Sequence, residues 1–250
     1  MCYPKQVGGK PVIYLQTPTH LPHVNIDLSL VSAWSFSALY PSTEPTSGVL
    51  PDGTRGQTAT WTVSADPDGT LHDKATGSDV AYLFWEAQTN PPRPLSPVSS
   101  RPGTPAVEAF DPARAVLTAQ DSVLLPISKI PAYLDSALKC LCLHTEARTS
   151  FITYWLPSLL KHQHVALRFL AQDAYEAAAP MRIVPTPEVM TRVFMLFRGV
   201  EAAALEGWEA ARLRADGDCA MWKDVVGVDT ARAMDTALFR VLEWGGMEVL

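Results

Sequence analysis

Long apolar runs, clusters of basic residues and an export signal are missing from this sequence, and each absence excludes a class of protein. No apolar run approaches the roughly 20 residues that a transmembrane helix needs, so membrane insertion is not expected. The formal net charge is −6, and lysines and arginines are not clustered, which argues against a nucleic-acid partner. The N-terminus has neither the basic nor the apolar region of a signal peptide, which predicts a soluble, cytoplasmic protein.

Cysteines are few, and their spacing matches no zinc motif. Cys140 and Cys142 lie two positions apart in an expected helix, where their side chains diverge, so a bond between them is not expected. Free thiols in a reducing compartment are the favoured interpretation. A disulfide that involves Cys2 or Cys219 is the alternative.

Motifs of the common enzyme scaffolds are missing as well. The sequence contains no GxSxG nucleophile elbow, no GxxxxGK[ST] phosphate loop, no GxGxxG after a strand and no HExxH zinc motif. His162 and His164 would share one face of an extended segment, but no third ligand accompanies them at a recognisable spacing. We therefore expect neither a cofactor nor a metal site.

Alternating apolar and polar residues predict strands throughout the first half of the chain. These strands are expected at residues 12–15, 24–30, 34–40, 59–65 and 80–86. A tight turn at 31–33 would pair the second of them with the third. The DPDG sequence at 66–69 has strong turn chemistry and would return the chain toward Leu71.

The second half changes to the helical period and then mixes helices with strands. Apolar residues at helical spacing predict a helix over 130–141 and another around 151–159, which Pro157 should end or kink. An Ala- and Leu-rich helix is expected at 201–215, followed by an irregular excursion at 216–229. Strands are expected at residues 164–170, 181–184, 193–197 and 237–244.

The predicted fold class is α+β, with a mostly antiparallel, sandwich-like N-terminal half and a C-terminal half of helices and further strands. We expect one compact unit over residues 1–250. It consists of a β-rich part at 10–87, an insertion and connection at 88–126, and a helix-containing α+β part at 127–250. Residues 89–112 are rich in proline and serine, which is typical of an exposed, extended loop.

Several rare motifs occur in a consistent order along the chain. They are KPVIYL at 10–15, the segment from Trp61 through DPDGTL, YLFWE at 82–86, FITYWLP at 151–157, RVFM at 192–195 and LEWGG at 242–246. In these motifs the chain resembles an uncharacterised family of Gram-positive bacterial proteins, often exported, with scattered fungal members. The resemblance implies a fold shared along the length and no established activity. It also allows an extracellular location, although the sequence lacks the export signal of those proteins.

Two glutamates stand out as candidate catalytic residues, Glu86 and Glu243. Side chains of a strand alternate between its two faces, which places Glu86 on one face with Tyr82 and Phe84, and Glu243 on one face with Val241. If these faces are buried, the pKa of each carboxyl rises, which suits a general acid. The alternative is that both strand ends reach solvent, or that each glutamate pairs with one of three arginines, Arg192, Arg198 or Arg240.

Aromatic residues near these glutamates are candidate ligand-binding residues. They are Tyr82, Trp85, Tyr154 and Trp244. Tryptophan beside a carboxylate is a common composition of a sugar-binding cleft. Tyr154 belongs to an aromatic stripe whose helical spacing also fits a core position.

These features predict a non-catalytic binding or interaction protein with an aromatic and carboxylate cleft, whose ligand is a glycan or a peptide. The alternative is a glycan-directed hydrolase that uses Glu86 and Glu243 as a carboxylate pair. A carboxyl separation of roughly 5–10 Å in one pocket is the geometry that such a hydrolase needs. Whether the protein is an enzyme stays open at this point.

Overall fold

A computed structural model describes residues 7–50, 53, 55–91 and 110–249 of the chain. It is an α+β fold with two mostly antiparallel sheets, as the sequence predicts. Most of the proline- and serine-rich segment, residues 92–109, lies outside the described residues, and so does Cys2. No helix among the described residues is long and apolar enough to cross a membrane.

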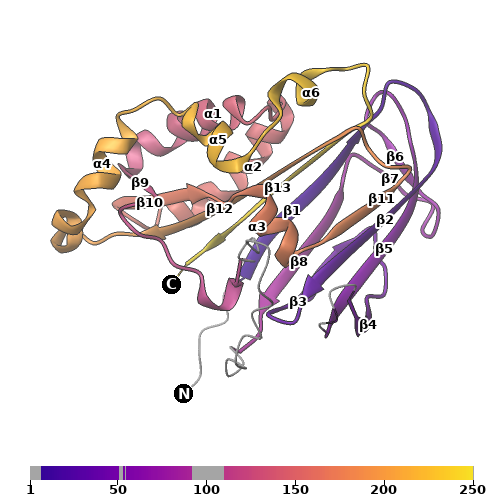
Figure 1. Cartoon of the computed structure of the whole chain (residues 1–250), viewed down its shortest axis with the longest axis horizontal. Helices are drawn as coiled ribbons and strands as arrows, with labels where there is room; N and C mark the ends of the chain where they lie inside the picture. Colours follow the sequence, from indigo (N-terminus) through magenta and orange to yellow (C-terminus); the bar gives the residue numbers. More distant parts are fainter. Residues whose placement is uncertain (1–6, 51–52, 54, 92–109, 250) are drawn as a thin grey trace, which may run out of the picture.

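The larger sheet combines both halves of the chain (Figure 1). Its seven described strands are, in spatial order, β3 (Trp34–Tyr40), β8 (Leu83–Thr89), β1 (Val7–Gln16), β13 (Arg240–Glu248), β12 (Val189–Gly199), β10 (His164–Phe169) and β9 (Val123–Pro126). Neighbouring strands run antiparallel except β12 and β13, which are parallel. The parallel pair lies near the middle of the sheet.

The smaller sheet comes almost entirely from the N-terminal half. Its described strands are, in spatial order, β11 (Met181–Val184), β2 (Leu21–Val31), β5 (Arg55–Ala65), β6 (Leu71–Asp73) and β7 (Asp79–Val80), with β4 (Thr46–Val49) paired to β5. The DPDG turn joins β5 to β6 as predicted, and Gly69 adopts φ = 90° there, a conformation that favours glycine.

Helices pack against both faces of the larger sheet. The described helices are α1 (Ile130–Cys140), α2 (Thr145–Leu159), α3 (Gln172–Ala178), α4 (Glu209–Ala215), α5 (Met221–Val226) and α6 (Thr230–Met234), with short 3₁₀ turns η1 (Pro112–Arg114), η2 (Ile127–Lys129) and η3 (Ala202–Trp208). Helices α1, α2 and α5 cover the face of the larger sheet that lies away from the smaller sheet (Figure 1), whereas Tyr175 and Ala178 of α3 pack into the core between the sheets.

Two apolar cores follow from this arrangement of layers. One core lies between the two sheets and includes Ile13, Trp61 and Trp85. The other lies between the larger sheet and the helices, and includes Phe151 and Trp244. Because both faces of the larger sheet are covered, its central strand β12 is buried at seven consecutive positions rather than at alternate ones.

Glycine at one position of β13 lets helix α2 lie close to the sheet. A Cβ atom on Gly246 would stand 2.9 Å from the Met195 backbone oxygen and 3.0 Å from Cζ2 of Trp155. Both distances are too short for an ordinary side chain. The LEWGG motif therefore has a packing role at this contact.

Several predicted elements need correction. Residues 24–30 and 34–40 do form strands, but β2 belongs to the smaller sheet and β3 to the larger one, so the turn between them crosses from sheet to sheet instead of closing a hairpin. The expected helix at 201–215 is divided into η3 and α4, and the expected irregular excursion at 216–229 contains α5. The final strand begins at Arg240 and ends at Glu248, later than predicted.

Trp61 is predicted to contribute strongly to stability. Its side chain is 2% exposed on the inner face of β5, and its indole Nε1 donates to the Pro41 oxygen at 2.9 Å. Trp61→Ala should lower the free energy of unfolding by about 3–5 kcal/mol, because it leaves a large cavity between the sheets. Chemical denaturation measures this loss.

Thr62→Ala is the matched control, because Thr62 lies on the other face of the same strand and bonds Asn25. We expect a loss of about 1 kcal/mol or less for this variant. Equal losses for the two variants would contradict the assignment of the faces of β5.

Candidate functional site

Glu243 lies in the core between the sheets and forms a buried ion pair. Its side chain is fully buried, and its Oε2 atom accepts from Nε of Arg192 at 2.6 Å. The other carboxylate oxygen accepts from the indole Nε1 of Trp85 at 2.8 Å. The interpretation of Glu243 as the partner of an arginine therefore holds, and its carboxylate is closed to solvent.

Arg192 is held by further groups around the same pair. Its Nη1 atom donates to the Ala179 backbone oxygen at 2.7 Å and pairs with Glu176, and its guanidinium lies over the Tyr175 ring. Burial lowers the pKa of Arg192, but the nearby Glu243 carboxylate and the other groups around it outweigh burial and raise that pKa. The guanidinium is therefore a fixed positive charge in the core.

Glu86 lies on the opposite face of the same sheet. In the strand register, Ile13 stands opposite both Leu83 and Glu243, while Val12 stands opposite both Phe84 and Trp244. Because side chains alternate between faces, Glu86 falls with Phe84 on the helix side. Tyr82 and Phe84 pack against the core on the helix side, whereas Leu83 and Trp85 occupy the core between the sheets.

The predicted aromatic residues are divided between the same two faces. Trp85 lies in the inter-sheet core, whereas Trp244 packs against Phe151 on the helix side, with ring centroids 5.2 Å apart. Tyr82 also lies on the helix side, 5.4 Å from the ring of Tyr14. Tyr154 is partly exposed on α2, and burial, together with the charge of Glu86, raises its pKa.

One shared cleft of Glu86, Glu243, Trp85 and Trp244 is therefore not formed. A sheet separates the two carboxylates, and Glu243 cannot reach a solvent-borne substrate. A glycosidase needs both carboxyls to flank the same glycosidic bond. The geometry thus removes the basis for a hydrolase built on this pair.

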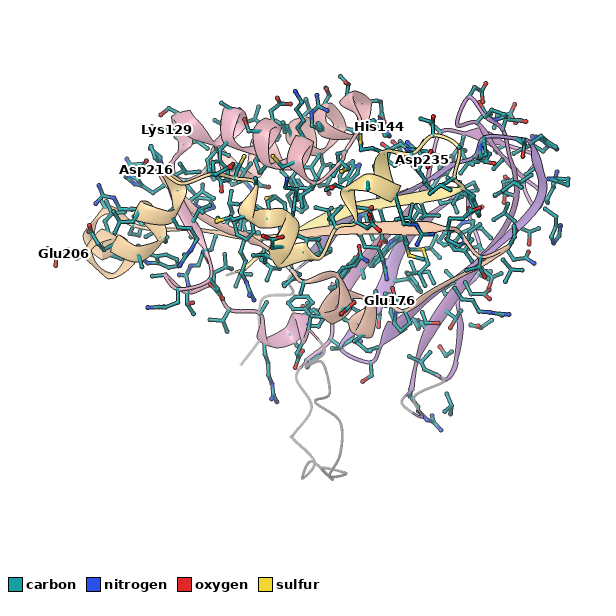
Figure 2. The ribbon with its side chains drawn as sticks, turned by 45° about the horizontal axis from the view of Figure 1, so that its top comes forward. Lys129, His144, Glu176, Glu206, Asp216 and Asp235 are labelled. Atoms are coloured by element: carbon teal, nitrogen blue, oxygen red, sulfur yellow. The ribbon has the colours of Figure 1, made fainter. Side chains whose placement is uncertain are left out.

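A cavity of about 740 Å³ lies elsewhere, at the end of the larger sheet where β1 stops. Its walls come from segments far apart in the sequence: the end of β1 and the residues after it, the β5–β6 turn, β7, the start of α2 and the start of β13. The polar residues that bear on its chemistry are Tyr14, Asp68, Asp79, His144, Glu146 and Arg240. Figure 2 labels His144, at the start of α2, and Asp235, just after α6, at this end of the molecule.

Tyr14 lies deepest among these polar residues. Its side chain is 6% exposed, and its ring stands edge-on to the His144 ring at 5.0 Å. Burial, and after it the nearby Glu146 carboxylate, raises the pKa of Tyr14. The Tyr14 hydroxyl thus stays protonated and can donate a hydrogen bond at any physiological pH.

His144 caps helix α2 and faces the cavity as a neutral ring. Its Nδ1 atom accepts from the Ala147 backbone N–H at 3.4 Å, which leaves the proton on Nε2. Burial is the main cause that lowers the pKa of His144, and the charges of Arg148 and Arg240 act in the same direction. The imidazole is therefore a neutral donor near pH 7.

Arg240 supplies the positive charge of the cavity wall. Its Nη1 atom donates to the Ala233 oxygen at 3.0 Å, whereas its Nε atom is buried with no hydrogen-bond partner among the described residues. Burial lowers the pKa of Arg240, and the charge of Asp235 opposes that shift. Arginine still remains charged, so the wall holds a cation with unused hydrogen-bonding capacity.

The carboxylates of the cavity differ in whether they already bond to other groups of the protein. Asp79 lies 2.5 Å from the ring of His72, and the Asp68 carboxylate accepts from the Thr70 N–H, which lowers the pKa of Asp68. Glu146, by contrast, stands exposed at the first turn of α2, beside the Tyr14 hydroxyl. Glu146 is the carboxylate that is best placed to meet a positive group of a ligand.

Sequence reasoning missed this cavity. Tyr14 stands in the KPVIYL motif, but nothing in the motif marks it as polar lining rather than core. The sequence offers Arg240 as one of three arginines that could pair with a glutamate, but in the structure Glu243 pairs with Arg192. The described residues include no group of three His, Cys, Asp or Glu side chains that could hold a metal ion.

No family model, curated protein or solved structure matches the chain. The similarity to the Gram-positive and fungal family stays a prediction from motifs.

Glu243→Gln is predicted to destabilise the protein by about 3–5 kcal/mol, because it leaves the Arg192 charge buried without its main partner. Glu86→Gln is the matched control, since Glu86 is partly exposed and, among the described residues, accepts only a 3.3 Å bond from Ser37. We expect the control to change stability by no more than about 0.5 kcal/mol. Thermal melts near neutral pH compare the two variants. A Glu243→Gln protein as stable as the parent would contradict the stabilising role of the ion pair.

His144 should make stability depend on pH. Its folded pKa lies below the unfolded value of about 6.5, so the unfolded chain binds the proton more readily. Its contribution is complete above pH 6.5 and is lost as the pH falls toward the folded pKa. His144→Asn keeps a helix cap and should reduce this loss, as measured by urea midpoints between pH 7.5 and 5.

His23→Asn is the control for this pH series, because His23 is exposed on β2. Its urea midpoints should follow those of the parent protein at every pH. An unchanged pH dependence in His144→Asn would mean that the imidazole titrates as it does in the unfolded chain.

Proposed function

We propose that the protein is a non-catalytic binding protein that holds a small zwitterionic ligand, such as an amino acid or a short peptide, in the cavity beside Tyr14. The observation that carries the proposal is Arg240, a cavity-lining cation that forms no ion pair among the described residues. A ligand carboxylate would give this guanidinium a charge-assisted hydrogen-bond partner.

The size and composition of the cavity support a small organic ligand. A volume of about 740 Å³ falls within the range of roughly 300–1,000 Å³ that is usual for small-molecule sites. Apolar lining from Leu15, Val80 and Pro67 would contact a side chain. The hydroxyl of Tyr14 and the imidazole of His144 would donate hydrogen bonds.

The charges favour a zwitterion over a neutral glycan. Arg240 would bind a carboxylate, while the exposed Glu146 would bind an ammonium group. A neutral sugar has no charge that could pair with either of these side chains. Both the peptide and the glycan expected from the sequence are thus candidates, and the charge pattern supports the peptide.

The cavity chemistry argues for binding rather than catalysis. The described residues that line it include no cysteine, lysine or serine, and its histidine is occupied as a helix cap. Tyr14 is a poor acid because its pKa is raised. None of these groups is activated as a nucleophile.

Calorimetric titration with uncapped dipeptides tests the proposal, with N-acetylated, C-amidated dipeptides and neutral oligosaccharides as comparisons. Uncapped dipeptides should bind, and capping both charges should weaken binding strongly. Arg240→Met should weaken binding by roughly 10–100-fold, the effect of one charge-assisted hydrogen bond, while its melting temperature is maintained or raised.

Arg182→Met is the matched control, because the Arg182 side chain is 77% exposed on β11 and, within the described part of the chain, pairs only with Asp27, at 3.7 Å. It should bind dipeptides like the parent protein. Binding of oligosaccharides but not dipeptides would contradict the zwitterion, and binding of neither would contradict the site.

A further inference from the structure

Two cysteines from distant parts of the chain face each other in the helix layer. Sγ of Cys140 lies 3.8 Å from Sγ of Cys219, although 79 positions separate the residues in sequence. Cys140 is the last residue of α1, and Cys219 lies just before α5. Both are free thiols and both are partly exposed.

We propose that Cys140 and Cys219 are a redox modification site that closes reversibly into a disulfide bond. A disulfide has an S–S length of about 2.05 Å, so each sulfur must move by only about 0.9 Å if the approach is shared. Cys140 ends its helix and Cys219 lies in a turn, and both side chains are partly exposed. This proposal is independent of the ligand cavity.

The elements that carry the two thiols are already fixed to each other. The indole Nε1 of Trp222, on α5, donates to the Tyr133 hydroxyl, on α1, at 2.8 Å. Trp222 is buried in the core beneath the helices, so α5 cannot swing away without losing that packing. The short separation of the two sulfurs therefore belongs to the folded state.

Small oxidants can reach the pair. Cys219 lines an open surface cavity of about 550 Å³, together with Tyr133, Ser136 and Asp218. Figure 2 labels Lys129 and Asp216, which line the same cavity, toward one end of the molecule. Peroxide can therefore approach Cys219 without unfolding of the helix layer.

Cys142 is the natural comparison, and it is not aligned for this bond. Its backbone adopts φ = 65° just after α1, and its Sγ approaches the Cys140 backbone oxygen at 3.9 Å. The selectivity of the pair thus follows from geometry rather than from the number of thiols in the region.

With hydrogen peroxide as the oxidant, the chemistry balances. The thiolate of one cysteine attacks a peroxide oxygen, which forms a sulfenic acid and releases hydroxide, and the hydroxide takes up a proton to become water. The second thiol then attacks the sulfenic sulfur, the S–S bond forms and a second water leaves. Burial, and after it the neighbouring Cys140 thiol, raises the pKa of Cys219 to about 11, so oxidation should be slow near neutral pH and faster as the pH rises.

Peptide mapping of the full chain after peroxide treatment tests the proposal directly. We expect one intramolecular disulfide between Cys140 and Cys219, reversed by dithiothreitol. Because it closes a loop of 79 residues, the melting temperature should rise on the order of 10 °C on oxidation. The Cys142→Ser variant should show the same bond and shift, and Cys219→Ser should show neither.

Mapping of the unsubstituted protein does not depend on whether a variant folds. Recovery of Cys140 and Cys219 as free thiols or sulfinic acids would overturn the proposal. Recovery of a bond from Cys142 to either of them would overturn it as well.

Discussion

The buried ion pair between Arg192 and Glu243 is the constraint on which the rest of the larger sheet depends. The two residues are direct partners in the parallel pairing of β12 with β13, and both side chains point into the core between the sheets. Trp85 of β8 and Glu176 of α3 bond the same pair from either side. One cluster thereby connects four elements of the fold.

A buried ion pair of this kind specifies register more than it adds stability. A slip of β13 by one residue would turn Glu243 toward the apolar helix side and leave Arg192 buried without its partner. Apolar partners could tolerate such a slip more easily. In the observed register, Trp244 meets Phe151 beneath α2, and Arg240 reaches the wall of the cavity.

Sequence patterns predicted the fold where only one face of a strand is buried. β2 and β5 have polar outer faces, so the alternation at Val24 to Leu30 and Ala59 to Ala65 identified both the strands and their inner faces. β8 is covered on both faces, so Phe84 and the preceding Tyr82 are as core-like in sequence as Leu83 and Trp85, and the pattern does not say which set faces which core. An alternating pattern separates the two faces of a strand, but it does not tell which apolar face packs against which core.

The candidate site depends on contacts between distant segments, which a local pattern cannot specify. Tyr14, His144 and Arg240 meet only because β1 and β13 pair and α2 starts above their ends. The sequence marks Glu243 as an unusual carboxylate with an arginine as a possible partner, but only the register of β12 with β13 identifies that arginine as Arg192. The approach of Cys140 to Cys219 likewise follows from the packing of α5 on α1.

A double-mutant cycle on the ion pair tests this account most directly. Arg192→Met, Glu243→Leu and the combined variant would be compared with the parent protein by urea denaturation. Each single variant leaves one charge uncompensated and should cost about 3–5 kcal/mol, whereas the double variant leaves none and should cost clearly less than the sum. Additive losses, with a coupling energy near zero, would show that the pair does not act as a unit and would contradict the account.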